Sequence, residues 1–165
     1  MRVAIPVFPG VEELDAVGPF EVFGLAKQAG LPVEAALVTH VAGGEVRGFH
    51  GMEFSGLVPF APEDGYDVIV VPGGAWISGV KEGVRLAIAD EVLPGILSRQ
   101  FERGALVASV CTGAFLLEAA GLLAGVRATT HHVAREELRD KGVEVCENRV
   151  VDAGRILTAG GITSG

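Results

Sequence analysis

The stretch ALVASVCTGAFLLEAAG, residues 105–121, constrains the possible fold more than any other part of this sequence. Residues 105–110 form an apolar, partly β-branched run that is too short for a globular helix and is typical of a buried parallel strand. After Cys-Thr-Gly, apolar residues return at helical spacing until Gly121, a common helix stop. Cys111 is therefore predicted to lie where a strand ends and a helix begins, which is the arrangement of a nucleophile elbow.

This position leaves two roles open for Cys111. A lone cysteine after a buried strand is more often an inert small apolar residue than a nucleophile. The carboxyl edge of an open α/β sheet, however, is where such folds bind ligands, and a helix N-terminus favours an anionic sulfur there. The rest of the sequence has to decide between the two roles.

Composition limits the function classes. The 165 residues suffice for one domain with a real core, and the 49% hydrophobic content excludes a disordered chain. A formal charge of −8 argues against nucleic acid or an anionic membrane as a partner, and no apolar run reaches the ~18 residues of a membrane span. Two cysteines without a disulfide framework, and no signal peptide, predict a cytoplasmic location. No histidine spacing is typical of metal ligands, so neither a metal nor a cofactor is expected.

Strand and helix patterns alternate along the chain, which predicts a mainly parallel sheet covered on both faces. Strands are expected at residues 2–8, 31–39, 67–71, 105–110, 127–130, 143–145, 149–152 and 156–159. Helices are expected at residues 11–29 with a kink or break at Pro19, at 84–103 where Pro94 can introduce a kink, at 114–121 and at 133–141. Residues 41–59 predict a hairpin or small side sheet. The final GGITSG resembles the entry to one more helix, so the single domain, residues 1–165, is expected to lack its last helix.

Polar and glycine positions that follow the predicted strands should meet at one edge of the sheet, because the carboxyl ends of parallel strands converge there. In chain order these positions are Asp15, Gly73, Gly74, Cys111 and His131. The paired glycines would let the backbone take a positive φ and approach a ligand closely. This convergence favours the functional role of Cys111 over the inert one.

Four ordered blocks of the sequence, VFPGVEELDAVGPFEVF, VIVVPGG, ASVCTGAFLLEAAGLLAGVRATTHH and ILTAGGITSG, resemble the ThiJ/PfpI superfamily. The resemblance spans nearly the whole chain and implies an α/β fold, the flavodoxin-like three-layer sandwich of class I glutamine amidotransferase-like proteins. Cys-Thr-Gly is similar to the isocyanide hydratases and to the amidotransferase-like domains of AraC-type regulators. Protease and glyoxalase-like members usually have His where this chain has Thr112. Isocyanide hydratases and AraC-type relatives often have Trp where this chain has His132.

The resemblance also implies roles for individual residues. Cys111 would be the nucleophile, and Asp15 would be the acid that hydrogen-bonds to it. The backbone N–H groups of Gly74 and Thr112 would form the oxyanion hole. The pocket would further contain Gly73, His131 and His132. Members of the superfamily are usually dimers, so a homodimer is expected.

Electrostatics restrict the state of Asp15. Lowering the pKa of a free thiol from ~8.5 to ~5 requires about 5 kcal/mol, and a helix terminus supplies at most ~2 kcal/mol. An ionised Asp15 would repel a thiolate, whereas a protonated Asp15 can donate a hydrogen bond to it. We therefore expect Asp15 to be a proton-carrying acid and Cys111 to be a low-pKa, partly accessible thiol. Glu12 and Glu13 are expected to be solvated.

Three functions are compatible with these residues. The first is a cofactor-free cysteine enzyme that acts on a small electrophile, with the isocyanide hydratase reaction as the specific version. The second is the ligand-sensing domain of an AraC-type regulator, which would bind a small molecule without turning it over. The third is a stress-response or redox-sensing protein in which Cys111 is oxidised.

Overall fold

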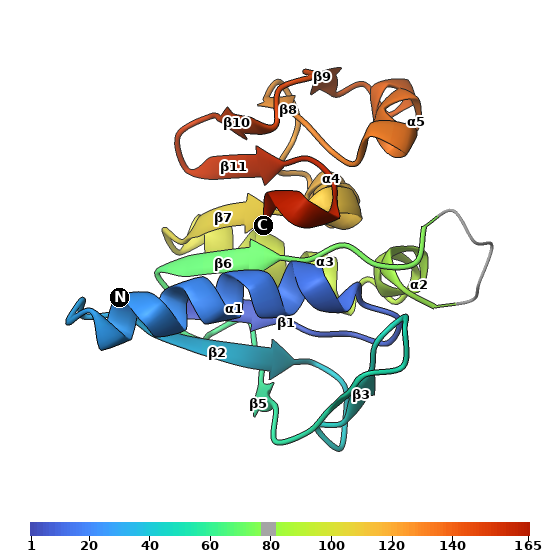
Figure 1. Cartoon of the computed structure of the whole chain (residues 1–165). Coiled ribbons are helices and arrows are strands. Elements are labelled where there is room, and N and C mark those ends of the chain that lie inside the picture. Colours follow the sequence, from blue (N-terminus) through green and yellow to red (C-terminus); the bar gives the residue numbers. More distant parts are fainter. Residues whose placement is uncertain (77–81) are drawn as a thin grey trace.

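The computed structural model, which describes residues 1–76 and 82–165, has a seven-stranded sheet at its centre (Figure 1). In chain order its strands are β1 (Arg2–Pro6), β2 (Glu34–Thr39), β5 (Val58–Pro59), β6 (Val68–Val71), β7 (Leu106–Ser109), β10 (Val150–Asp152) and β11 (Ile156–Ala159). Their spatial order is β10-β11-β7-β6-β1-β2-β5. Every neighbouring pair is parallel except β10 and β11. The predicted mainly parallel sheet is confirmed.

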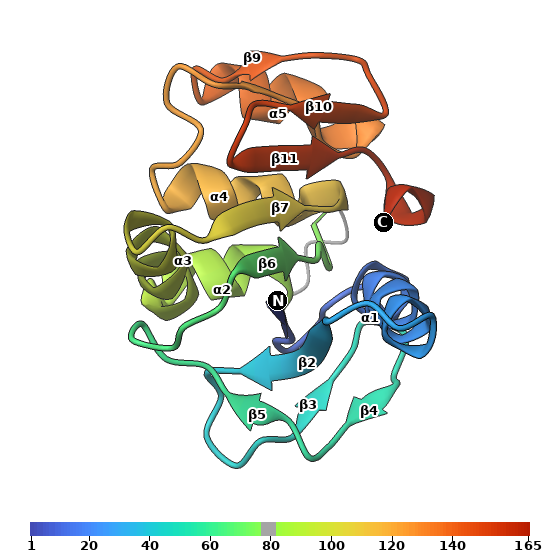
Figure 2. The ribbon, with the colours of Figure 1, turned by 90° about the vertical axis from the view of Figure 1, so that its left-hand side faces the viewer.

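Helices cover both faces of this sheet (Figure 2). Helix α1 (Glu13–Gln28) lies on one face, and α2 (Val84–Ala89), α3 (Val92–Glu102) and α4 (Ala114–Ala119) lie on the other. Helix α5 (Arg135–Asp140) lies beyond β11, beside the small parallel pair of β8 (Arg127–Ala128) and β9 (Glu144–Val145). The three-layer, flavodoxin-like sandwich is therefore the fold of this chain.

The region 41–59 forms more than the predicted hairpin. Strands β3 (Val46–Arg47) and β4 (Glu53–Phe54) make an antiparallel pair of their own, as expected. Strand β5 instead joins the main sheet beside β2, so it extends the edge of that sheet. The turn between β3 and β4 passes close to the start of α1, where the backbone N–H of Phe49 donates to the carbonyl of Val11 at 2.9 Å.

Two expected helices differ in continuity from the prediction. Helix α1 continues through Pro19, so of the kink or break expected there the break does not occur. The expected helix at 84–103 is two helices, α2 and α3, and the chain separates them at Glu91, which has a left-handed φ of 58°. Pro94 is the third residue of α3, in the first helical turn, where a residue without an N–H costs no helical hydrogen bond.

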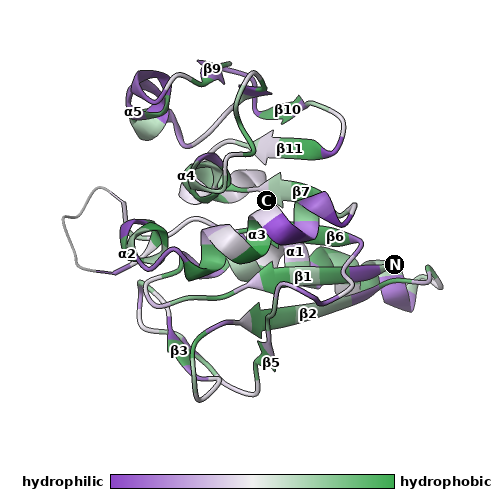
Figure 3. Cartoon of the chain, turned by 180° about the vertical axis from the view of Figure 1, so that it is seen from behind, coloured by the Kyte–Doolittle hydropathy of each residue, from purple (hydrophilic) through white to green (hydrophobic). Residues whose placement is uncertain are grey.

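The core lies on the central strands, whose residues are apolar on both faces (Figure 3). Val3, Ala4 and Ile5 of β1 are fully buried, as are Ile69 and Val71 of β6. Such continuous apolar runs, rather than alternating ones, are what parallel strands covered on both faces require. Helix α5, REELRD, is mostly hydrophilic by comparison, and only its Leu138 is fully buried.

No helix among residues 1–76 and 82–165 is long and apolar enough to cross a membrane. The expected homodimer, the cytoplasmic location and the absence of nucleic acid as a partner stay predictions.

Replacing Gly113 by Ala is expected to destabilise the protein by ~1–3 kcal/mol, because the added Cβ would meet the carbonyl oxygens of Val71 and Pro72. Gly24→Ala, inside α1, is the matched control, since a Cβ there meets nothing within 4 Å. That change should be neutral or stabilising by up to ~1 kcal/mol. Urea unfolding of both variants measures the difference, and equal midpoints would contradict the close approach at Gly113.

Candidate active site

Cys111 lies directly after β7, as the first residue of a single 3-10 turn, η1 (Cys111–Gly113), that leads into α4. Its φ of 55° places a non-glycine residue in the left-handed region, which costs ~1–2 kcal/mol. Hydrogen bonds fix both of its backbone groups: its N–H donates to the carbonyl of Gly160 at 2.7 Å, and the Thr130 hydroxyl donates to its carbonyl at 2.7 Å. The predicted strand-to-helix position is confirmed, and the conformation is the strained one expected of an elbow.

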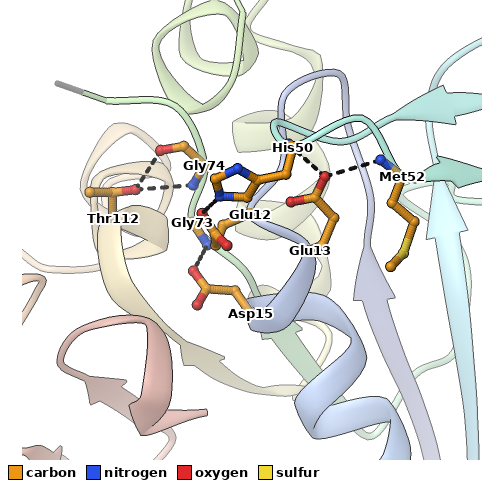
Figure 4. Close-up of polar contacts among 8 residues, drawn as sticks. All are labelled: Glu12, Glu13, Asp15, His50, Met52, Gly73, Gly74 and Thr112. Carbon is orange, nitrogen blue, oxygen red and sulfur yellow. Dashed lines mark hydrogen bonds and ion pairs between the residues drawn. The ribbon is translucent and has the colours of Figure 1, made fainter. Parts of the chain in front are cut away.

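Asp15 is the third residue of α1, and its side chain is fully buried behind the elbow. The backbone N–H of Gly73 donates to Asp15 Oδ2 at 2.9 Å (Figure 4). Asp15 Oδ1 has no hydrogen-bond partner among the described N and O atoms. A Cβ on Gly73 would lie 2.9 Å from Asp15 Oδ2 and 2.6 Å from Thr112 Oγ1, so only glycine permits this approach.

Burial raises the pKa of Asp15 to about 7, against the opposing effect of the hydrogen bond from Gly73. Burial, followed by the charge of Asp15, raises the pKa of the Cys111 thiol to about 12, although hydrogen bonds from Thr112 oppose the rise. The carboxyl and the thiol therefore hold two protons below about pH 7 and share one above it. A carboxyl with this pKa can carry a proton at neutral pH, as the predicted role of Asp15 requires.

The predicted low pKa of Cys111 disagrees with this geometry, because burial raises the pKa of the thiol. Only 6% of Cys111 is exposed, and the loss of hydration disfavours a thiolate. The helix that follows, α4, has six residues and begins only after η1, so its dipole contributes little at the sulfur. Neither the burial of the sulfur nor its contact with Asp15 can be recognised from the sequence around Cys111.

Gly74 and Thr112, the predicted oxyanion-hole residues, lie together beside the sulfur. The N–H of Gly74 donates to Thr112 Oγ1 at 3.2 Å, and the same hydroxyl lies 3.2 Å from the Gly74 carbonyl oxygen (Figure 4). The backbone N–H of Thr112 donates toward the Cys111 sulfur. Both N–H groups are therefore engaged inside the protein, and a bound anion would have to draw the Gly74 donor away from the Thr112 hydroxyl.

Gly74 is required for a different reason from the expected one. Its φ is not in the left-handed region. A Cβ there would lie 2.5 Å from the carbonyl oxygen of Gly10 and 3.1 Å from Val11 Cα, both of which are backbone atoms. A Gly74→Ala change would therefore disturb the packing of the two loops as well as any anion site, and it cannot separate the two effects.

A cavity of about 170 Å³ opens at the sulfur. Its lining combines apolar side chains with a few polar groups, and consists of Glu12, Phe49, Gly74, Ala75, Trp76, Cys111, Thr112, His131 and Ile162. Four of the seven predicted site residues thus line the cavity. Asp15 and Gly73 lie behind it, buried, and His132 is exposed and outside the lining, so its predicted place in the pocket is wrong.

Trp76 is the largest wall residue that sequence analysis missed. Its ring stacks on Phe115 with 3.9 Å between centroids, and its Nε1 donates to Glu137 at 2.9 Å. The guanidinium of Arg85 lies 3.9 Å from the centre of the same ring and also bonds Glu137. These contacts with Phe115, Arg85 and Glu137 fix the ring as part of the wall, but the partners are distant in sequence and no local pattern indicates them.

His131 forms part of the cavity wall. Burial, followed by the nearby charges of His132 and Arg135, lowers its pKa, so the ring is neutral at neutral pH. Its Nδ1 lies 3.4 Å from the backbone N–H of Val133 and accepts from it. The unprotonated Nδ1 leaves the proton on Nε2, so this nitrogen is the donor of the neutral ring.

The expectation that both Glu12 and Glu13 are solvated is also wrong. Glu13 is 6% exposed, and its Oε1 accepts from the backbone N–H groups of His50 at 2.7 Å and Met52 at 3.3 Å (Figure 4). The side chain of Glu12 is 14% exposed and forms part of the cavity wall. Consecutive acids at the start of α1 thus have structural contacts that the sequence does not reveal.

Comparison with known proteins agrees with this architecture. A family model described as the DJ-1/PfpI family matches residues 1–165. The isonitrile hydratase of Pseudomonas putida is 34% identical over 165 residues, which cover all of this chain and 67% of that protein. A deglycase of Thermococcus kodakarensis is 31% identical over 161 residues, 96% of this chain and 89% of that protein.

Solved structures of ThiJ/PfpI and DJ-1 proteins are also similar to this chain. A ThiJ/PfpI family protein from Pseudomonas syringae superposes with a TM-score of 0.82 at 28% identity, over 99% of this chain and 63% of that one. This chain thus spans less than two thirds of that structure. DJ-1 of Schizosaccharomyces pombe superposes with a TM-score of 0.78 at 19% identity, which shows the shared fold. With a family model across its whole length and a relative above 30% identity, this chain belongs to the DJ-1/PfpI family.

Proposed function

We propose that this chain is a cysteine enzyme that adds water to an isocyanide, R–NC, to give the formamide R–NH–CHO. The observation that carries the proposal is the position of Cys111, a strained residue at the floor of a small cavity, in contact with the buried acid Asp15. A nucleophile with an adjacent proton carrier is the combination that covalent catalysis needs. The similarity to an isonitrile hydratase supports this choice of reaction.

The reaction proceeds in three steps on these groups. The sulfur of Cys111 attacks the terminal carbon of R–NC, and the proton that it shares with Asp15 goes to that carbon, which gives the thioimidate R–N=CH–S. Water then adds across the C=N bond, with its hydroxyl on carbon and its proton on nitrogen. Finally the C–S bond breaks, its electron pair returns to sulfur, the hydroxyl proton returns to the Cys111–Asp15 pair, and the formamide leaves.

The cavity favours a small neutral substrate. Its volume is about 170 Å³, and Phe49, Trp76 and Ile162 supply apolar walls. An isocyanide is neutral and carries no hydrogen-bond donor of its own, so these walls do not oppose its binding. Thr112, in place of the His that follows the nucleophile in glyoxalase-like relatives, argues against α-oxoaldehydes as the substrate. The deglycase relative nevertheless makes them the comparison to include in an assay.

Turnover of a small alkyl isocyanide should disappear in Cys111→Ser and fall ~10²–10⁴-fold in Asp15→Asn, because an amide cannot deliver a proton. Glu53→Gln, an exposed carboxylate on β4, is the matched control and should keep full activity. Formamide production by the three variants, measured beside consumption of an α-oxoaldehyde, decides the reaction class. Activity on the oxoaldehyde alone, or retained hydration in Cys111→Ser, would refute the proposal, and binding without turnover would favour a sensing domain.

Removal of the Thr112 hydroxyl should lower kcat/KM by about tenfold. This hydroxyl accepts from the backbone N–H of Gly74 and hydrogen-bonds to the Cys111 sulfur. A hydrogen bond to a charged group is worth ~1.5–3 kcal/mol. Thr112→Val keeps the branched shape without the hydroxyl, and Thr112→Ser keeps the hydroxyl without the methyl group. The serine variant should therefore retain most of the activity. Equal rates for the two variants would show that shape, rather than hydrogen bonding, is what matters at this position.

The raised pKa of Asp15 predicts a pH-dependent stability. Its folded pKa, about 7, lies above the unfolded value of 3.8, so the folded state holds this proton more tightly. The stabilisation is complete below about pH 4 and is lost as the pH rises through about 7. Asp15→Asn does not titrate, so its stability relative to the natural protein should increase by about 2–3 kcal/mol between pH 5 and pH 8. Urea unfolding at both pH values measures this, and a pH-independent difference would mean that the pKa of Asp15 is ordinary.

A further inference from the structure

We propose that Glu12, Glu13 and His50 form a binding site for a divalent transition-metal ion such as Zn²⁺. Each residue contributes one possible ligand atom, and these atoms lie within 4.8 Å of one another. The inference does not rest on the proposed function, because these residues are separate from the Cys111–Asp15 pair. The sequence predicted no metal site because His50 is 37 residues from Glu13 and joins it only through the turn between β3 and β4.

The strongest evidence is an unpartnered oxygen of Glu13. This side chain is 6% exposed, and its Oε1 accepts two backbone N–H groups, whereas its Oε2 has no hydrogen-bond partner among the described residues. In Figure 4 the free oxygen points toward the ring of His50 and the carboxylate of Glu12. A buried carboxylate oxygen without a donor is costly, and a cation in front of it would remove that cost.

The remaining ligands have the right separation for a metal. Glu12 Oε2 and His50 Nε2 are 3.4 Å apart. Two atoms that each bind Zn²⁺ at about 2.1 Å with tetrahedral geometry are also about 3.4 Å apart. The side chain of His50 is 66% exposed and that of Glu12 is 14% exposed, so both can move toward the fixed Glu13. Closure of the site thus needs small side-chain rotations and no change of backbone.

The donor set selects the class of ion. An imidazole nitrogen favours zinc and its neighbours over Mg²⁺ and Ca²⁺, which prefer oxygen ligands alone. Three protein ligands would leave a fourth position for water. The cation would also relieve the repulsion between two adjacent carboxylates. Because Glu12 lines the cavity of Cys111, the ion would sit at the wall of that cavity and fix the position of the turn that carries Phe49.

The test is a direct titration of zinc into the full chain. Chelator-treated protein with Cys111→Ser and Cys146→Ser is used, so that neither thiol can bind zinc. Calorimetric titration should show one Zn²⁺ per chain, much weaker binding of Mg²⁺, and a rise in the unfolding temperature with zinc. Glu13→Gln and His50→Gln should each weaken zinc binding at least ~10-fold.

Matched control variants test whether zinc binds at this cluster rather than elsewhere on the surface. Glu53→Gln and His132→Gln change an exposed carboxylate and an exposed imidazole outside the cluster, and should bind zinc as tightly as the parent. Glu13→Gln retains an oxygen to accept the two backbone N–H groups, and its metal-free unfolding shows whether it folds. His50→Gln alters an exposed side chain and remains informative if Glu13→Gln does not fold. No zinc binding by the parent, or equal binding by the parent and His50→Gln, would overturn the proposal.

Discussion

The left-handed backbone of Cys111 is the constraint on which the rest of the site depends. A cysteine at a φ of 55° persists only where the surrounding structure holds it in place. Here the Cys111 N–H donates to the carbonyl of Gly160, and the Thr130 hydroxyl donates to the Cys111 carbonyl. Gly160 follows β11 and Thr130 follows β8, so the geometry of the elbow requires the carboxyl-terminal third of the fold to be in place. Gly113 must then lack a side chain, because the turn passes against the carbonyl oxygens of residues 71 and 72.

The second constraint is the burial of two ionisable groups beside each other. A carboxylate and a thiolate in contact, both out of water, cannot be charged together, so the Asp15–Cys111 pair keeps one proton over the physiological range. The N–H of Gly73 fixes the carboxyl, and Thr112 supplies donors at the sulfur, so a single negative charge is stabilised wherever it resides within the pair. The burial of Asp15 beside Cys111 is therefore enough to keep a proton next to the nucleophile.

The sequence predicted the parts of this architecture that depend on local pattern. The strand at 156–159 and the junction at Cys111 were predictable, because apolar runs and the glycines that end them are local signals. The break at Glu91, the burial of Glu13 and the wall formed by Trp76 were not, since each depends on partners distant in the chain. The pKa of Cys111 was misjudged for the same reason: desolvation depends on all the atoms around the sulfur, not on its neighbours in sequence.

The first turn of α1 shows how one short segment serves several sites. Successive helical residues differ in direction by about 100°, so Glu13 and Asp15, two apart, lie on opposite sides of α1, whereas Glu12 precedes the helix in an extended conformation. Glu12 accordingly lines the cavity and Asp15 lies beneath the sulfur, whereas Glu13 binds the turn between β3 and β4. Residues 12–15, at the start of α1, thus present a carboxylate to the cavity, to the nucleophile and to the backbone of the β3–β4 turn. A rotation of α1 about its axis would misplace all three groups together, which couples the position of the β3–β4 turn to the geometry at Cys111.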